Sequence, residues 1–461
     1  MNNIIMKVKS FFIAAKLIIL LLLISVSGLF SQNNVINLSL QECIKIAVEK
    51  NTNVRTALIE KQKTEGIISE TYSALYPKIS VGGNFQDNLK LAVMLLPGEI
   101  FQQPGTFIPV SFGTKYTANA AANMNMILYN QTALTALKLS KKVLELNDLG
   151  IEKVKEELAF ELSKLYFMTL TTAQQKNILV ENIKRTNQLK DITKVLVDNG
   201  VALQLDYDRV NISIENLLTQ LSNVESGLEQ QLNTLKYILN IPLRDSIVLT
   251  DDAERVLLEN NPNMKTDFSN HIDIRLLESQ KELNRLNKKI VNSGYYPTLV
   301  FQGQYAFQGM RNEFKNYFKD SPESHWYQSA NISLGLSIPI FDGFEKKSKS
   351  NQVELEYQQT EIQIADKKEN FNVNYSVAIN NYNNHKTNLE RQKQNIQLAT
   401  NVYNETALKY KEGMAAMSNL LQDEMSLSAA QANYLSALYN FKEVELKIMS
   451  LNGDILKLTK N

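Results

Sequence analysis

The sequence predicts a mainly α-helical protein with a small β-barrel contribution, built from two structural repeats. Three observations predict this fold class. Two very long tracts, 131–199 and 345–412, contain one glycine and no proline. Four short stretches alternate between apolar and polar side chains with the period of a strand. The same order of features occurs twice along the chain, which indicates an internal repeat.

Composition supports a folded protein with long helices. Of the 461 residues, 44% are hydrophobic and 21% are charged, which are values of globular chains. The 9 prolines and 17 glycines are few for this length, so helices are interrupted rarely. The net charge of +1 is far from the strongly basic charge that is typical of nucleic-acid-binding proteins. We therefore expect no nucleic-acid partner.

The N-terminus has the pattern of a secretory signal peptide, which we place at 1–31. Three lysines precede an apolar run at 17–24, and small residues follow up to Ser31. The run is too short to span a bilayer by the rule of roughly 20 residues. An uncleaved anchor helix is the alternative. Removal of 1–31 leaves 46 basic and 48 acidic residues, a net charge of −2.

The only cysteine is Cys43, so a disulfide within the chain is impossible. No apolar leader ends at Cys43, which argues against lipid attachment there. The preceding Ser39-x-x-Glu42 is a capping box, which predicts the start of a helix. We therefore expect Cys43 to be a small buried residue of that helix.

Matching motifs define the two repeats. Tyr76-Pro77 matches Tyr296-Pro297, Leu128-Tyr129-Asn130 matches Ile340-Phe341-Asp342, and Gly200 matches Gly413. Each repeat is expected to contain a helix, two strands, a very long helix, a turn and a second helix. The predicted segments are a first repeat at 32–240, a linker at 241–270, a second repeat at 271–453 and a C-terminal tail at 454–461.

The alternating stretches predict strands at about 77–93, 111–129, 297–310 and 328–341. Their polar faces almost lack charge, which is typical of membrane barrel strands and unusual for the exposed face of a soluble sandwich, the alternative fold. Four strands cannot close a barrel, because about eight is the smallest useful number. Open edges in lipid leave backbone groups unpaired, so sister chains must complete the wall. Two or three copies would satisfy this requirement.

The long tracts predict two antiparallel helical hairpins, at 130–240 and 343–452, which turn at Gly200 and Gly413. At about 1.5 Å per residue, each long tract could reach on the order of 100 Å. An apolar position recurs every seven residues in the first tract, which predicts left-handed supercoiling against a neighbour. Its members are Leu137, Leu144, Ile151, Leu158, Leu165, Thr172 and Leu179.

Short motifs add a family resemblance across about 37–453. They are Leu38-Ser-Leu-Gln-Glu at the first helix, Tyr-Pro before each odd strand, Ile338-Pro-Ile-Phe-Asp-Gly343 after the fourth strand, and Lys409-Tyr-Lys-Glu-Gly413 at the second hairpin turn. In this order and spacing they resemble the TolC-type outer-membrane efflux protein family. The resemblance implies a homotrimer with a twelve-stranded barrel in outer-membrane lipid and a coiled-coil periplasmic tunnel.

The resemblance also implies a role and partners. The chain would be a passive exit duct of a tripartite efflux or secretion system, gated at the hairpin tips. It would receive its cargo from an inner-membrane pump through a periplasmic adaptor protein. An exported coiled-coil structural or surface protein without channel activity is the alternative. That alternative explains the leader and the helices. It does not explain four charge-poor strands, two of which occur in the same order in each repeat.

The resemblance assigns candidate gate residues near the hairpin turns. Asp206 matches an acidic aperture position of the family. Asn419 and Gln422 stand where many relatives carry aspartates, which puts a carboxylate ring in doubt and would weaken cation selectivity. Nearby charges could supply the latch instead, or could be solvated charges on a helix face. The candidates are Asp206, Asp208, Arg209, Asn419, Gln422 and Asp423.

Two further segments resemble the motifs that meet the adaptor, Asn199-Gly200-Val201 and Glu412-Gly413-Met414. The glycines are also needed simply to turn a helix back on itself. Nothing in the sequence indicates an enzyme, a cofactor or a metal site. The three histidines are far apart, HExxH and CxxC are missing, and no glycine-rich phosphate loop follows a strand.

Overall fold

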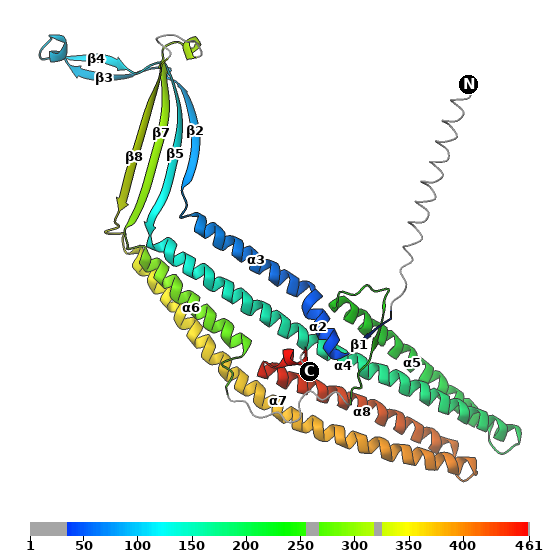
Figure 1. The fold of residues 1–461 in the computed structure, drawn as a ribbon. Coiled ribbons are helices and arrows are strands. Elements are labelled where there is room, and N and C mark those ends of the chain that lie inside the picture. Colours follow the sequence, from blue (N-terminus) through cyan, green and yellow to red (C-terminus); the bar gives the residue numbers. More distant parts are fainter. Residues whose placement is uncertain (1–34, 255–266, 318–324, 460–461) are drawn as a thin grey trace, which may run out of the picture. The chain divides into compact units, whose positions relative to one another are not determined.

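A computed structural model of the chain describes residues 35–254, 267–317 and 325–459 (Figure 1). The predicted signal peptide and part of the linker lie outside these described residues. The chain forms two compact units. Among the described residues, the first comprises 35–56, 152–254, 267–271 and 369–459, and the second comprises 57–151, 272–317 and 325–368. Each unit therefore combines segments of both sequence repeats.

The second unit contains one antiparallel four-stranded sheet. Its strands are β2 (Lys78–Asp87), β5 (Tyr116–Asn130), β7 (Thr298–Arg311) and β8 (Trp326–Ser337), in the order β2-β5-β7-β8. The central pair β5–β7 joins the two repeats. The predicted fold, mainly helical with two repeats and four such strands, is confirmed. Within the described residues, β2 and β8 each pair with a single neighbour.

The first strand is shorter than expected, and an additional hairpin follows it. We expected a strand at about 77–93 and a loop to about 111, but β2 ends at Asp87. The strands β3 (Ala92–Pro97) and β4 (Phe107–Phe112) then pair around the short helix η2 (Gly98–Phe101). Apolar residues on both sides of a Pro-Gly turn favour this hairpin, a signal that the loop interpretation overlooked.

The fourth strand also ends earlier than the alternation suggests. We expected it at about 328–341, but β8 ends at Ser337, which pairs with Thr298 at the start of β7. Beyond Ser337 no partner residue remains on β7, and Pro339 lacks a backbone donor. The strand therefore stops where its neighbour begins.

The long helices begin in the same way in both repeats. The helix α4 (Gln131–Asp198) follows Asn130, whose side chain accepts a hydrogen bond from the Ala133 N–H at 3.0 Å. The helix α7 (Glu345–Lys411) follows Asp342, which accepts from the Lys346 N–H at 3.1 Å. Asn130 and Asp342 are equivalent repeat positions, so both repeats use a polar side chain to satisfy the first free N–H groups.

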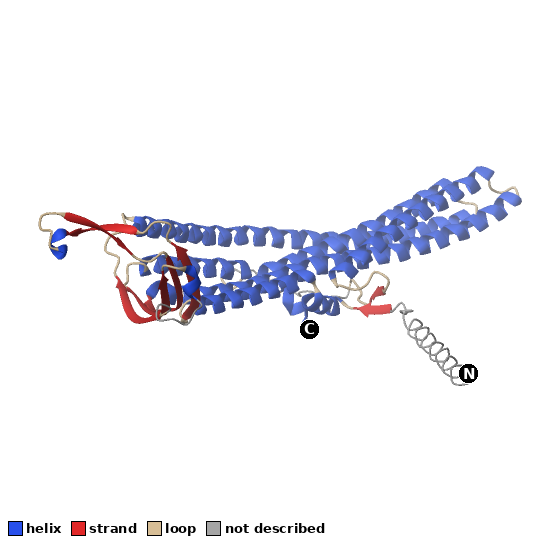
Figure 2. Cartoon of the chain, turned by 90° about the horizontal axis from the view of Figure 1, so that it is seen from above, coloured by secondary structure: helices blue, strands red, loops and turns tan. Residues whose placement is uncertain are grey.

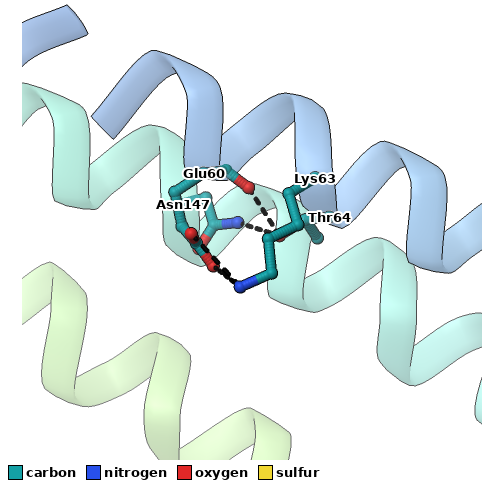
Figure 3. A network of polar contacts seen from close by, with 4 residues as sticks. All are labelled: Glu60, Lys63, Thr64 and Asn147. Carbon is teal, nitrogen blue, oxygen red and sulfur yellow. Dashed lines mark hydrogen bonds and ion pairs between the residues drawn. The ribbon is translucent and has the colours of Figure 1, made fainter. Parts of the chain in front are cut away.

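Each long helix of the second unit packs against a shorter helix, α3 (Thr52–Ser73) or α6 (Ile272–Ser293). In the first repeat, the Asn147 amide donates to the Thr64 hydroxyl (Figure 3). In the second repeat, the Asn284 amide donates to the Thr360 hydroxyl at 3.0 Å. Thr64 corresponds to Asn284 in the repeat, and Asn147 and Thr360 lie on the long helices. Each repeat therefore joins its shorter helix to its long helix by an Asn–Thr bond, with the Asn and Thr exchanged between the helices.

The first unit is almost entirely helical, apart from a short parallel pair of β1 (Val35–Leu38) and β6 (Ser246–Leu249) (Figure 2). Its further elements are α2 (Leu40–Lys50), α5 (Gln204–Ile238), α8 (Met417–Asn452) and the short helix η4 (Ile455–Thr459). The capping box predicted at Ser39 and Glu42 is present. The strand β6 lies in the segment that we expected to be a linker.

A hydrophobic core joins these elements of the first unit. Its fully buried side chains include Cys43, Tyr166 and Leu235. The Tyr166 hydroxyl lies 3.1 Å from the Leu38 carbonyl oxygen and 2.9 Å from a carboxylate oxygen of Asp251. Asp251 also accepts the Leu40 N–H at 2.8 Å, so this buried polar cluster is satisfied internally.

The seven-residue seam predicted for α4 is buried or half-buried along its whole length. None of the helices within the described residues has an apolar stretch long enough to cross a bilayer.

Candidate pore wall and gate

The strand register separates the sheet into two chemically distinct faces. On one face, directly opposed residues are mostly apolar, as in Val81–Ala122 and Phe301–Leu334. Ile79, Val81, Ile332 and Leu334 on this face are all largely exposed in the single chain. Exposed apolar rows on two edge strands indicate a surface that faces an apolar environment or another chain.

The opposite face is formed by amide and hydroxyl groups. Ser80, Asn123, Gln304 and Asn331 occupy one row across the four strands. The Gln304 amide donates to Asn123 at 3.0 Å, and the Asn331 amide donates to Gln304 at 3.2 Å. This face is therefore polar, nearly uncharged and partly cross-linked by side-chain hydrogen bonds.

Aromatic rings cover one end of the apolar face. Phe85 of β2 stacks on Tyr116 of β5 with 6.0 Å between ring centroids. The short helix η3 (Phe314–Tyr317) folds onto them, and Tyr317 contacts Trp326 with a centroid distance of 6.2 Å. Trp326 is the first residue of β8, so these rings cluster at the end of the sheet where β8 begins.

The two hairpin tips of the first unit share one geometry. Gly200 has φ 76° and Gly413 has φ 73°, which is the left-handed region that favours glycine. The Val201 N–H donates to the Leu196 carbonyl at 2.8 Å, and the Met414 N–H donates to the Lys409 carbonyl at 2.8 Å. These are Schellman turns. The predicted tip residues thus lie at the turns, with Val201 and Met414 exposed.

The candidate gate residues of α5 lie in its first two turns. Asp206 is half-buried and forms an ion pair with Arg209, with 3.4 Å between the carboxylate oxygen and the guanidinium nitrogen. Asp208 is exposed and accepts a hydrogen bond from the Gln204 amide at 3.0 Å. The structure therefore brings Asp206 and Arg209 together.

The candidates of α8 are placed differently. Asn419 and Gln422 are exposed, and Asp423 is half-buried. Among the described residues, no hydrogen bond or ion pair joins these three to the α5 candidates. The next residue, Glu424, is only 4% exposed. Glu424 thus differs in burial from the candidate acids Asp423, which is half-buried, and Asp208, which is exposed.

A hydrophobic core near the tips holds the two hairpins together. It contains Val210 and Ile214 of α5, Tyr410 of α7, and Met417 and Leu420 of α8. The Tyr410 hydroxyl lies 3.5 Å from the hydroxyl of Thr193 on α4. Burial raises the pKa of Tyr410, the bond to Thr193 lowers it, and the nearby Asp206 charge raises it further. Tyr410 therefore lies in the electric field of the first gate candidate.

Sequence reasoning missed a second polar cluster in the same helices. A guanidinium nitrogen of Arg185 on α4 lies 2.6 Å from the Asn182 side-chain oxygen and 3.5 Å from Glu424. The guanidinium also lies over the Tyr403 ring, 5.4 Å from its centroid. Arg185 is one of many cations on a long polar helix, and only its neighbours in space distinguish it. Glu424 follows the gate candidates Gln422 and Asp423, but no feature of the sequence indicates that it is buried.

Sequence comparison decides the family. The sequence model described as "Outer membrane efflux protein" matches residues 43–240 and 269–454. The chain belongs to the outer membrane efflux protein family. The two matched segments of this efflux protein correspond closely to the two predicted repeats. No curated protein matches the sequence significantly.

Solved channel structures share the fold of this efflux protein. CusC is 15% identical, with a TM-score of 0.72, and covers 89% of this chain and 91% of its own. The open-state MtrE outer membrane channel of Neisseria gonorrhoeae is 16% identical, with a TM-score of 0.72, and covers 92% and 90%. VceC of Vibrio cholerae is 13% identical, with a TM-score of 0.68, and covers 90% and 96%. At 13–16% identity, these similarities show the fold of the chain.

Proposed function

We propose that this efflux protein is the passive exit duct of a tripartite efflux or secretion system in the outer membrane. Sister copies form a homotrimer, whose twelve strands close a barrel and whose helical hairpins form a periplasmic tunnel. A signal peptide at 1–31 directs export and is removed. The observation that carries the proposal is a four-stranded sheet with one apolar face and one amide-lined face, whose two edge strands lack an outer neighbour among the described residues.

The geometry of the edges supports ring closure. The four strands alternate in direction, so β8 of one copy and β2 of the next run antiparallel when the copies are related by rotation. Such head-to-tail contacts generate a closed ring when the rotation between copies closes on itself. In lipid, closure removes the unpaired backbone groups, each of which costs several kcal/mol. Three copies provide a wider, aqueous bore than the eight strands of two copies.

The hairpin tips support a gate and a docking end. We propose that Asp206 and Arg209, with Asp208, Asn419, Gln422 and Asp423 nearby, restrict the periplasmic entrance. We propose that the tips 199–201 and 412–414 meet the periplasmic adaptor, which links the duct to an inner-membrane pump. Because amides stand at Asn419 and Gln422, the entrance should prefer cations less than a full carboxylate ring would.

Single-channel recording in planar bilayers tests the proposal. The mature protein should insert and show a small conductance in its closed state. Asp206→Ala removes the partner of Arg209 and should increase the conductance or the open probability. The control Glu215→Ala changes an exposed acid further along the same helix. Absence of any conductance from the folded wild-type oligomer and from Asp206→Ala would contradict the proposal.

A further inference from the structure

A groove lies between α5 and α8 of the first unit, within the helical hairpins. Its volume is about 720 Å³, within the range of sites that hold drug-sized molecules. Its walls include Ile212 and Leu217 of α5 and Met425, Ser428 and Ala429 of α8. Ile212 and Met425 are largely exposed, so apolar side chains border an open groove with small residues along one wall.

Glu424 is the charged residue that lines this groove and is itself buried. Its side chain is 5% exposed, and its Oε1 atom lies 3.5 Å from Arg185, at the limit of a hydrogen bond. Its Oε2 atom is buried and accepts no hydrogen bond from any described residue. An ionised carboxylate has about four acceptor positions. Glu424 therefore has acceptor capacity that the protein does not use.

Arg185 is held away from a tighter pairing with Glu424. Its shorter hydrogen bond goes to Asn182, which is itself bonded to Gln431 at 3.0 Å. Its guanidinium lies over the ring of Tyr403. A bidentate Arg–carboxylate pair would use both oxygens of Glu424. The single long contact leaves Oε2 of Glu424 and Nε of Arg185 without a hydrogen-bond partner among the described residues.

The charges around the groove favour a cation. Arg209 also lines it, but this guanidinium is paired with Asp206 and is 45% exposed. Asp423 of α8 adds negative charge next to Glu424 in the sequence, and Asp208 adds it next to Arg209. An anion would have to compete with Asp206 for Arg209. An ammonium group would meet an under-satisfied carboxylate among apolar walls.

We propose that the α5–α8 groove binds a small organic cation with an apolar body, whose ammonium N–H groups bond to Glu424. The apolar body would pack between Ile212 and Met425, and the small residues near Ala429 leave room for it. This site goes beyond the proposed export role and does not depend on channel activity.

Equilibrium binding to the full mature protein in detergent tests the site. The probe is 1-naphthylmethylammonium, and its uncharged counterpart is 1-naphthylmethanol, both measured by calorimetry. We expect saturable binding of the ammonium at one site per chain. Both the alcohol with wild type and the ammonium with Glu424→Gln should bind at least tenfold more weakly. Glu215→Gln, which changes an exposed acid of α5 that does not line the groove, should leave the affinity unchanged.

A second variant keeps the test valid if Glu424→Gln does not fold. Ala429 is exposed, so Ala429→Phe should fill the groove without disturbing the core and should abolish binding of the ammonium. Absence of saturable binding to folded wild type would overturn the proposal. Equal affinities of ammonium and alcohol, or unchanged affinity in Ala429→Phe or in folded Glu424→Gln, would overturn it as well.

Discussion

Cys43 illustrates how burial decides the chemistry of a single residue. It is fully buried in the core of the first unit, as the sequence suggested. Burial, with smaller effects of the Asp251 and Glu42 charges, raises the pKa of its thiol to about 12. At pH 8, only about one thiol in ten thousand would then be ionised.

The thiol should therefore be unreactive in the folded protein. At pH 8, a maleimide should not label Cys43 over hours, whereas denaturant should allow complete labelling within minutes. Mass spectrometry of the intact chain distinguishes these outcomes. Rapid labelling of the native protein would show that α2 does not hold the buried position described above.

Glu424 should make stability depend on pH. Burial raises the pKa of its carboxyl above the ordinary value, and Arg185 offsets part of the rise. The folded state therefore holds the proton more tightly than the unfolded state does. Its stabilising contribution is present below the ordinary pKa and is lost as the pH rises through the higher folded value.

Glu424→Gln, which cannot ionise, should show this effect as a difference between melting temperatures. Relative to wild type, the variant should gain thermal stability between pH 4.5 and pH 8. Thermal melts of both proteins at a series of pH values measure the gain. Parallel curves for the two proteins would contradict the assignment, and Asp423→Asn is the matched control.

The exchanged Asn–Thr bond allows a test of whether the helix pairs of the two repeats use equivalent contacts. Asn147→Ala leaves the buried Thr64 without its partner from α4 and should cost about 1–3 kcal/mol. The double variant Thr64→Asn with Asn147→Thr copies the arrangement of Asn284 and Thr360. It should recover most of the stability lost in either single exchange.

Thermal unfolding in detergent, with the Asn284–Thr360 pair left intact, measures this recovery. If the double exchange is no more stable than the less stable single variant, then the two repeats do not use equivalent contacts.

Elements differ in how well the sequence predicts them. The long helices follow directly from tracts without proline, and the strand faces follow from period-two alternation. The β3–β4 hairpin was missed because both of its faces are apolar, so it has no alternation to detect. The end of β8 depends on where β7 begins, which is a property of pairing and not of the local sequence.

The candidate site, too, could be predicted from the sequence only in part. Glycines that need positive φ mark both hairpin turns in the sequence, and the structure places them there. The Arg185–Glu424 contact joins residues that are 239 positions apart, and no spacing rule connects them. Charges on long helices look alike in sequence, because their burial depends on which helices become neighbours.

Adjacent residues of β8 test the assignment of the two sheet faces. Ile332 belongs to the apolar face and Asn331 to the amide row. If the apolar face contacts lipid, Ile332→Lys should cost about 2–4 kcal/mol and reduce membrane insertion. Asn331→Lys should be tolerated and should shift conductance toward anions. Heat resistance of the oligomer and reversal potentials measure the two effects, and the opposite ranking would reverse the assigned faces.

In the whole molecule, the proposed barrel closes only where sister chains supply outer neighbours for β2 and β8. The sheet belongs to one chain, but its two edges and its apolar face are left open within the described residues. Backbone groups at such edges are costly in hydrocarbon, and the proposed sharing of the barrel wall between copies would pair them. Family membership is consistent with this requirement.

Native mass spectrometry of the mature protein released from detergent micelles tests this claim most directly. We expect particles of three chains that persist until the detergent-solubilised protein is denatured. A folded single chain that stays soluble in water without detergent and has no affinity for bilayers would contradict it.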